Sequence, residues 1–214
     1  MQVKEVLQSR VVQIAKTPIN MAWVPDLLRE IGDKYEFTIV PKPEDLWKVA
    51  EPKAEFKHGR LGANIIDTFG LFHDGFVVDT TTSTENSEFF LKDLLQWLKT
   101  KVPTLKENGK PFYLSQLEVS LELGRFGKVL DSIGNEIFQL LAKYELLGVG
   151  PYAVSTLQLA QDPLGKIGPN LSIFGIERRR DIRYADNIFF AQAPLRPVDH
   201  KAMLEALEGV LASI

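Results

Sequence analysis

The chain has 214 residues, of which 45% are hydrophobic and 25% are charged, a composition typical of a packed globular protein and not of a disordered or fibrous one. The formal net charge of −3 argues against a protein that coats nucleic acid with its whole surface. The sequence contains no cysteine, which excludes disulfides, thiolate nucleophiles and iron–sulfur clusters.

The N-terminal residues lack the basic and then apolar layout of a signal peptide, and no run approaches about 18 apolar residues. The absence of cysteine suits a reducing compartment. We therefore expect a cytoplasmic protein that does not associate with a membrane. The length allows one domain or two, and we predict a single domain over residues 1–214.

The first predicted elements are a short helix and a β-hairpin. Pro25 suits the first position of a helix, so a helix is predicted to begin there. Strand-like segments at residues 65–72 and 76–80 flank His73-Asp74-Gly75. Because Asp-Gly between two apolar runs is a strong hairpin signal, these two segments are predicted to pair.

A long helix is predicted over residues 84–102. Thr82 and Glu85 have the spacing of a capping box at its start, and Pro103 marks its end. Its apolar residues recur at helical spacing, which predicts a buried face: Phe90, Leu91, Leu94, Leu95, Leu98 and Val102.

A half-buried strand and a second long helix are predicted next. In the segment 112–123 apolar and polar residues alternate from Leu117 on, and the apolar face consists of Leu117, Val119, Leu121 and Leu123. The segment 128–146 has an apolar stripe with a period near 3.6 residues: Leu130, Ile133, Ile137, Leu141 and Tyr144. Gly148 and Gly150-Pro151 are predicted to end this helix.

The last third of the chain is predicted to contain three strands and a helix. The strands are expected at residues 152–160, 171–178 and 186–193, with a loop rich in proline and glycine over residues 162–170. Asp199 is predicted to cap a helix over residues 199–212. The residues expected on its inward face are Met203, Leu204, Leu207, Val210 and Leu211.

These elements predict an α+β fold with a predominantly antiparallel sheet and helices packed on one face. The order strand, strand, polar loop, helix occurs over residues 54–102 and again over residues 152–212. This suggests an internal β-β-α pseudo-repeat. Residue identity between the halves is poor, so both duplication and convergence stay open.

The sharpest local feature is a cluster of four arginines within six residues: Arg178, Arg179, Arg180 and Arg183. Clustered guanidinium groups bind phosphate or carboxylate, so these residues are the candidate anion-binding site. Two other interpretations stay open, a solvated hairpin tip partly neutralised by nearby acids and a protein interface anchored by arginine. Replacing Arg178 and Arg180 together with glutamine is predicted to leave the fold intact, as exposed substitutions usually do.

Other polar segments give weaker signals. Lys57-His58-Gly59-Arg60 is a second basic segment, which would join the arginine cluster if both lay on one edge of the sheet. The hydroxyl-rich stretch 79–86 precedes a helix N-terminus, where free backbone N–H groups attract anions. The stretch has no glycine-rich cradle and no P-loop lysine, so a solvated helix cap after a threonine-rich strand end is the favoured interpretation.

Metal and catalytic motifs do not stand out in the sequence. The three histidines lack metal-ligand spacing: His58, His73 and His200. Three aspartates straddle the hairpin and would bind a divalent metal only if the fold brought them together: Asp67, Asp74 and Asp79. Dinucleotide-binding and nucleophile-elbow motifs are missing from the sequence. We predict no bound metal or cofactor, and we name no catalytic residue.

Two hypotheses for function follow. The first is a non-enzymatic binding or assembly protein, of bacterial or phage accessory type, that forms homo-oligomers or contacts a protein partner. It would use sheet edges and the aromatic pairs Phe89-Phe90 and Phe189-Phe190. The second is a protein that binds, or also hydrolyses, an anionic ligand such as a nucleotide or nucleic acid through residues 178–183.

Overall fold

A computed structural model of the protein describes residues 1–16, 24–42, 53–121, 125–141, 153–160 and 173–211. Its strands are β1 (Gln2–Lys16), β2 (Ala54–Leu61), β3 (Asn64–Phe72), β4 (Gly75–Thr80), β5 (Lys106–Glu107), β6 (Phe112–Ser120), β7 (Thr156–Leu159), β8 (Phe174–Arg178) and β9 (Ile188–Ala193). Its α-helices are α1 (Pro25–Lys34), α3 (Thr84–Lys101), α4 (Arg125–Leu141) and α5 (Pro197–Leu211), and a 3₁₀ helix η3 (Tyr184–Asp186) precedes β9.

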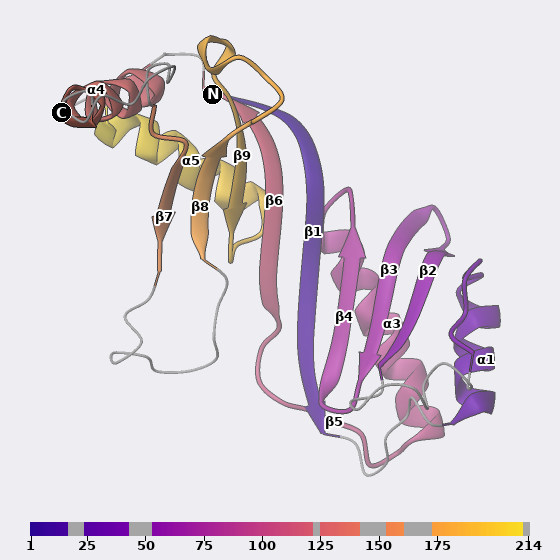
Figure 1. Cartoon of the computed structure of the whole chain (residues 1–214). Coiled ribbons are helices and arrows are strands. Elements are labelled where there is room, and N and C mark those ends of the chain that lie inside the picture. Colours follow the sequence, from indigo (N-terminus) through magenta and orange to yellow (C-terminus); the bar gives the residue numbers. More distant parts are fainter. Residues whose placement is uncertain (17–23, 43–52, 122–124, 142–152, 161–172, 212–214) are drawn as a thin grey trace. The chain divides into compact units, whose positions relative to one another are not determined.

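The nine strands form one antiparallel sheet, and the helices pack against it (Figure 1). The strand order is β2-β3-β4-β1-β6-β9-β8-β7, and β5 pairs with β1 off this path. The predicted α+β class with a predominantly antiparallel sheet is confirmed. In the described ranges no helix is long and apolar enough to span a membrane.

The chain forms two compact units. The N-terminal unit is Gln8–Leu114, and the C-terminal unit combines Met1–Leu7 with Ser115–Ile214. Strands β1 and β6 each begin in one unit and end in the other. The number of independently folding domains therefore stays a prediction.

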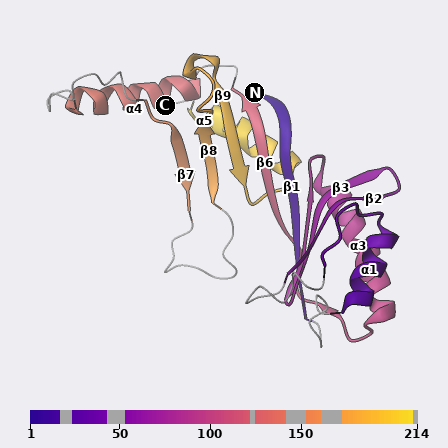
Figure 2. The same cartoon turned by 45° about the vertical axis from the view of Figure 1, so that its right-hand side comes forward.

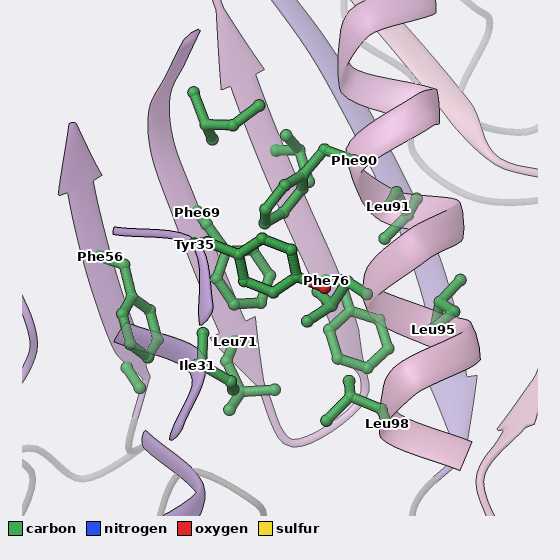
Figure 3. Close-up of a cluster of buried hydrophobic side chains, with 14 of the residues drawn as sticks. Ile31, Tyr35, Phe56, Phe69, Leu71, Phe76, Phe90, Leu91, Leu95 and Leu98 are labelled. Carbon is green, nitrogen blue, oxygen red and sulfur yellow. The ribbon is translucent and has the colours of Figure 1, made fainter. Parts of the chain in front are cut away.

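In the N-terminal unit, β2, β3 and β4 form a meander whose last strand pairs with β1. Helices α1 and α3 lie on the same side of these strands (Figure 2). Buried aromatic rings join the layers, since Phe69 on β3 stacks on Phe56 at 5.4 Å between centroids and meets Phe90 of α3 edge-on at 5.6 Å (Figure 3). Such offset and edge-on contacts add to the burial of apolar area that holds the helices on the sheet.

The predicted hairpin is confirmed at β3 and β4. Phe72 pairs with Gly75, so His73 and Asp74 form a two-residue turn. Gly75 is also required by packing, because a Cβ atom there would lie 2.3 Å from the carbonyl oxygen of Gln13 on β1. The absence of a side chain lets β4 approach β1 closely.

The helix predicted over residues 84–102 is α3, and all six apolar residues of its predicted face are buried. The predicted cap is wrong. Ser83, not Thr82, is the N-cap, and its Oγ accepts a hydrogen bond from the backbone N–H of Asn86 at 3.4 Å. Thr82 instead accepts a bond from the side-chain amide of Asn86 at 2.9 Å. A hydroxyl side chain stands at both positions, so the sequence alone does not decide between them.

Replacing Ser83 with alanine is expected to lower the free energy of unfolding by about 1 kcal/mol, because the N-terminal N–H groups of α3 lose their side-chain acceptor. Thr82→Ala is the matched control and should cost less than about 0.5 kcal/mol, since it removes only an exposed side-chain bond. Urea unfolding followed by circular dichroism measures both. Equal losses in the two variants would contradict the assignment of the cap to Ser83.

The C-terminal unit is built around β6, β9, β8 and β7, with α4 and α5 packed on its core. Its strands match those predicted at 112–123, 152–160, 171–178 and 186–193, with narrower bounds. The core is apolar: Leu117, Val119, Leu121, Leu130, Phe174, Ile176, Phe189, Ala191, Ala193 and Leu204. The predicted loop at 162–170 and the positions Leu123, Tyr144, Gly148 and Gly150-Pro151 lie outside the described residues.

Both helices of the C-terminal unit differ in detail from the sequence prediction. On α4, Leu130 is buried, but Ile133 and Ile137 of the same stripe are each 46% exposed. Helix α5 begins at Pro197, so Asp199 lies in its first turn and is not the N-cap. Proline is favoured at that first position, and an aspartate in the first turn still interacts favourably with the helix dipole. Val210 is 58% exposed, contrary to its predicted inward position.

The internal repeat is longer than the predicted β-β-α unit. The N-terminal series β1-α1-β2-β3-β4-α3 has the same order of strands and helices as β6-α4-β7-β8-β9-α5. Within each series the strands take the same positions in the sheet, β2-β3-β4-β1 and β7-β8-β9-β6. The repeated unit is therefore β-α-β-β-β-α, and it begins with a strand and a helix that the predicted repeats over residues 54–102 and 152–212 did not include.

Candidate functional site

The arginine cluster begins at the last residue of β8, and its first member is buried. Arg178 has 2% of its side chain exposed. Its Nη2 donates to Asp131 Oδ1 at 2.6 Å and to the carbonyl oxygen of Gly127 at 3.1 Å, both on α4. Its Nη1 donates to the carbonyl oxygen of Tyr184 at 3.2 Å, and the guanidinium lies over the rings of Tyr184 and Phe189. Arg178 therefore joins β8 to α4, η3 and β9.

The other three arginines also have carboxylate partners. Arg179 forms a two-point contact with Asp181 at 3.0 and 2.9 Å and a third with Glu118 at 2.9 Å. These contacts raise the pKa of Arg179 and lower that of Asp181. Two further pairs involve exposed arginines, Arg180 with Glu177 at 3.0 Å and Arg183 with Asp186 at 3.5 Å. All four positive charges are thus partly neutralised within the protein.

Arg178 and Arg180 differ sharply in exposure. The expectation that Arg178 is exposed is wrong, so the predicted tolerance of the Arg178 and Arg180 double replacement loses its basis. Arg180 is 87% exposed and fits the expectation. Anion binding by Arg178, Arg179, Arg180 and Arg183 stays a prediction, and only the last three have solvent-exposed side-chain surface to offer.

The second basic segment lies inside strand β2 and not at a turn. His58 has a φ of 54°, in the left-handed region that non-glycine residues seldom adopt. Lys57 pairs with Glu55 at 3.1 Å, and Arg60 pairs with Glu36 at 2.5 Å. This segment belongs to the N-terminal unit and the arginine cluster to the C-terminal unit, so their union in one patch stays a prediction.

The acidic residues around the hairpin are not brought together as a metal site. Asp79 forms a two-point contact with Arg10 on β1 at 2.7 and 2.8 Å, which raises the pKa of Arg10. Asp74 lies at the exposed turn, 3.9 Å from His73. Among the residues that the structure describes, no group of three His, Asp or Glu side chains could hold a metal ion.

A buried serine–histidine pair joins the first turn of α5 to β6, and the sequence analysis predicted no site there. His200 and Ser115 are both 0% exposed, and Nδ1 of His200 lies 2.8 Å from Oγ of Ser115 on β6. Nε2 of His200 has no hydrogen-bond partner among the described residues, and burial lowers the pKa of His200 to about 4. Because both side chains are shielded from solvent, we assign the pair a structural role.

A groove of about 590 Å³ lies beside α3 in the N-terminal unit. Its base includes the buried side chains of Leu91 and Leu95, with Gln13 of β1 also buried against it. Its volume falls in the range of about 300 to 1,000 Å³ typical of small-molecule sites. The sequence analysis assigned Leu91 and Leu95 to the core, and both are buried. Helical spacing does not reveal that they also line a groove, because the groove depends on the segments packed beside α3.

Charged side chains line the rim of this groove. Lys99 of α3 pairs with Glu107 of β5 at 2.6 Å. The hydroxyl of Tyr113 donates to Glu88 Oε1. Lys92, on the same helix, has no hydrogen-bond or ion-pair partner among the described residues. The groove therefore combines apolar lining residues with a lysine that has no partner in the described part of the chain.

Comparison with protein-family models, with curated proteins and with solved structures finds no match. Three features carry chemistry: the largely self-paired arginine cluster, the groove beside α3, and the outer edges of the sheet.

Proposed function

We propose that this chain is a non-enzymatic binding or assembly protein that self-associates through the free edge of β7. The observation that supports this is the chemistry of β7. It is the last strand in the sheet order, no described strand pairs with its outer edge, and its sequence Thr156–Leu159 contains no charged residue. Exposed strand edges pair readily with other chains unless charges, proline or a covering segment protect them.

The strand at the other end of the order, β2, has those protections. It carries Glu55, Lys57 and Arg60, and His58 distorts its backbone with a positive φ. Its outer edge also forms a bridge with Ile39, since the backbone of Lys57 exchanges two hydrogen bonds with that residue at 3.0 and 3.2 Å. Both edge strands of the sheet could pair with another chain, but in the described part of the chain only β2 carries features that prevent it. This difference favours a role for the β7 edge in self-association.

The register of β7 with β8 shows which backbone groups of β7 point outward, toward a strand of another chain. Arg178 donates its backbone N–H to the carbonyl oxygen of Ser155, so these two residues form a hydrogen-bonded pair. Antiparallel pairs alternate, and the backbone groups of Thr156 and Gln158 therefore point away from β8. Leu159, 57% exposed, and Ile173, 43% exposed, add apolar area near this edge. A second copy of the strand offers the same uncharged groups, which suits a two-fold contact.

Replacing Thr156 and Gln158 together with lysine is expected to convert the assembly to monomer, because in a two-fold pairing the new charges face one another. The double variant Thr100→Lys with Asn108→Lys is the matched control, since it adds the same charge at exposed positions of the N-terminal unit. Light scattering coupled to size exclusion measures the mass of the wild type and both variants.

The expected result is a multiple of the chain mass for the wild type and the control, and the chain mass for the β7 variant. A monomeric wild type would overturn self-association. An assembly that survives the β7 substitutions with circular dichroism unchanged would overturn the assignment of the contact to this edge. Gln158→Pro is a second variant, because it removes an outward N–H without adding charge.

A further inference from the structure

The groove beside α3 has a shape and charge that define a ligand class. Leu91 and Leu95, 4% and 6% exposed, bring apolar surface to its base, and Pro111 adds to it from the segment before β6. Leu91, Leu95 and Pro111 are the apolar members of the lining, and apolar lining residues favour a ligand with an apolar part. The groove is therefore suited to a small molecule with a hydrocarbon part.

The charged residues at the rim of the groove indicate which charge a ligand would carry. The positive charge of Lys99 is matched by Glu107, with Nζ and Oε1 2.6 Å apart. The carboxylate of Glu88, which also lines the groove, accepts a hydrogen bond from the hydroxyl of Tyr113. Lys92 is left as the one lining cation without a partner in the described part of the chain. A single negative charge on the ligand would complement it.

We propose that this groove binds a small monoanionic amphiphile, an apolar body that ends in one carboxylate. The apolar part lies on Leu91 and Leu95, and the carboxylate lies at Lys92. This site is separate from the arginine cluster, and it goes beyond self-association because its ligand and its residues belong to the N-terminal unit. A dianionic phosphate is less suited, since Lys92 is the one partnerless cation that the described residues bring to the groove.

Binding is tested with three probes that share one chain length: octanoate, 1-octanol and octylammonium. Titrations at low ionic strength are followed by the methyl NMR signals of Leu91 and Leu95. We expect octanoate to bind about three- to fivefold more tightly than octanol, the size of an exposed ion pair worth up to about 1 kcal/mol. Octylammonium should bind more weakly than either, and added salt should reduce the advantage of octanoate.

Two variants locate the site. Lys92→Gln should abolish the difference between octanoate and octanol while octanol binding is unchanged. Gln96→Trp, at an exposed position on the rim, should weaken all three probes by filling the groove. Lys106→Gln is the control, because it removes an exposed lysine of β5 that does not line the groove. Circular dichroism confirms that each variant is folded.

Three outcomes would overturn the proposal. The first is equal affinity for octanoate and octylammonium. The second is octanoate binding that Lys92→Gln and Lys106→Gln reduce alike, which would indicate attraction by net charge only. The third is the absence of saturable shifts at Leu91 and Leu95 with all three probes. Because the oligomer mass is measured independently, a failure here leaves the β7 contact to its own test.

Discussion

Replacing Arg178 with alanine is expected to lower the free energy of unfolding by about 4 kcal/mol. The substitution removes a large side chain that is 2% exposed, and it leaves the carbonyl oxygen of Gly127 without the guanidinium that now donates to it. Asp131 contributes little to the loss, because its carboxylate is 53% exposed and regains water when the pair is broken. The cost therefore comes from a cavity and a lost buried hydrogen bond.

Three further variants separate these causes. Arg178→Met keeps most of the volume, so it should cost about half as much as alanine. Asp131→Asn should cost less than about 1 kcal/mol, and Arg180→Gln, at a position 87% exposed, less than about 0.5 kcal/mol. Urea unfolding followed by circular dichroism gives all four values. If Arg178→Ala were as stable as Arg180→Gln, the structural role of Arg178 would be wrong.

The second large expected effect is a loss of stability in acid that depends on His200. Burial lowers the pKa of His200 to about 4, whereas a histidine in the unfolded chain titrates near 6.5. The unfolded state therefore takes up a proton between these pH values and the folded state does not. The contribution of His200 is complete above about pH 6.5 and is lost as the pH falls toward 4, for a total of about 3 kcal/mol.

The hydrogen bonding of His200 also favours a lowered pKa. An imidazolium must donate from both nitrogens, but Nε2 of His200 has no acceptor among the described residues. Asp93 and Glu55 also have lowered pKa values, so the wild type loses some stability in acid for other reasons. His200→Gln isolates the histidine, because those carboxylates are unchanged in it.

The measurement is urea unfolding at several pH values from 7 to 4 for the wild type and His200→Gln. We expect the wild type to be the more stable at pH 7, and its advantage to shrink by about 3 kcal/mol toward pH 4. Ser115→Ala should destabilise the protein without removing the pH dependence, since the imidazole stays buried. Parallel curves for the wild type and His200→Gln would show that His200 does not titrate in this range.

Elements governed by neighbouring residues were predictable from the sequence. The apolar spacing of α3 predicted its face, and the Asp-Gly turn predicted the pairing of β3 with β4. The alternation in β6 identified a half-buried strand with Leu117 and Val119 on its core face. These signals are local, because helix and hairpin contacts join residues that are close in the chain.

The sequence pattern did not predict strand β1, because both of its faces mix polar and apolar residues. Its core-facing positions include two polar residues, Ser9 and Gln13, which are 0% and 3% exposed. Their side chains form hydrogen bonds, Ser9 Oγ to Thr82 O at 3.4 Å and Gln13 Nε2 to Ile14 O at 2.9 Å. Because Val12 and Ile14 on the opposite face are also half-buried, β1 shows no clean alternation of apolar and polar residues. Its pairing with β4 and β5 and its place beside β6 in the sheet identify it as a strand.

The candidate sites depended on tertiary structure to a greater degree. The arginine cluster was visible in the sequence, but the burial of Arg178 depends on Asp131, which is 47 residues away. Ser115 and His200 are 85 residues apart, and the groove beside α3 combines residues from β1, α3 and β5. Periodicity in one segment shows which residues share a face, but burial and charge pairing depend on the segment that packs against it. For this chain, the local pattern determined the elements, and long-range packing decided which polar groups are paired and which remain available to a ligand.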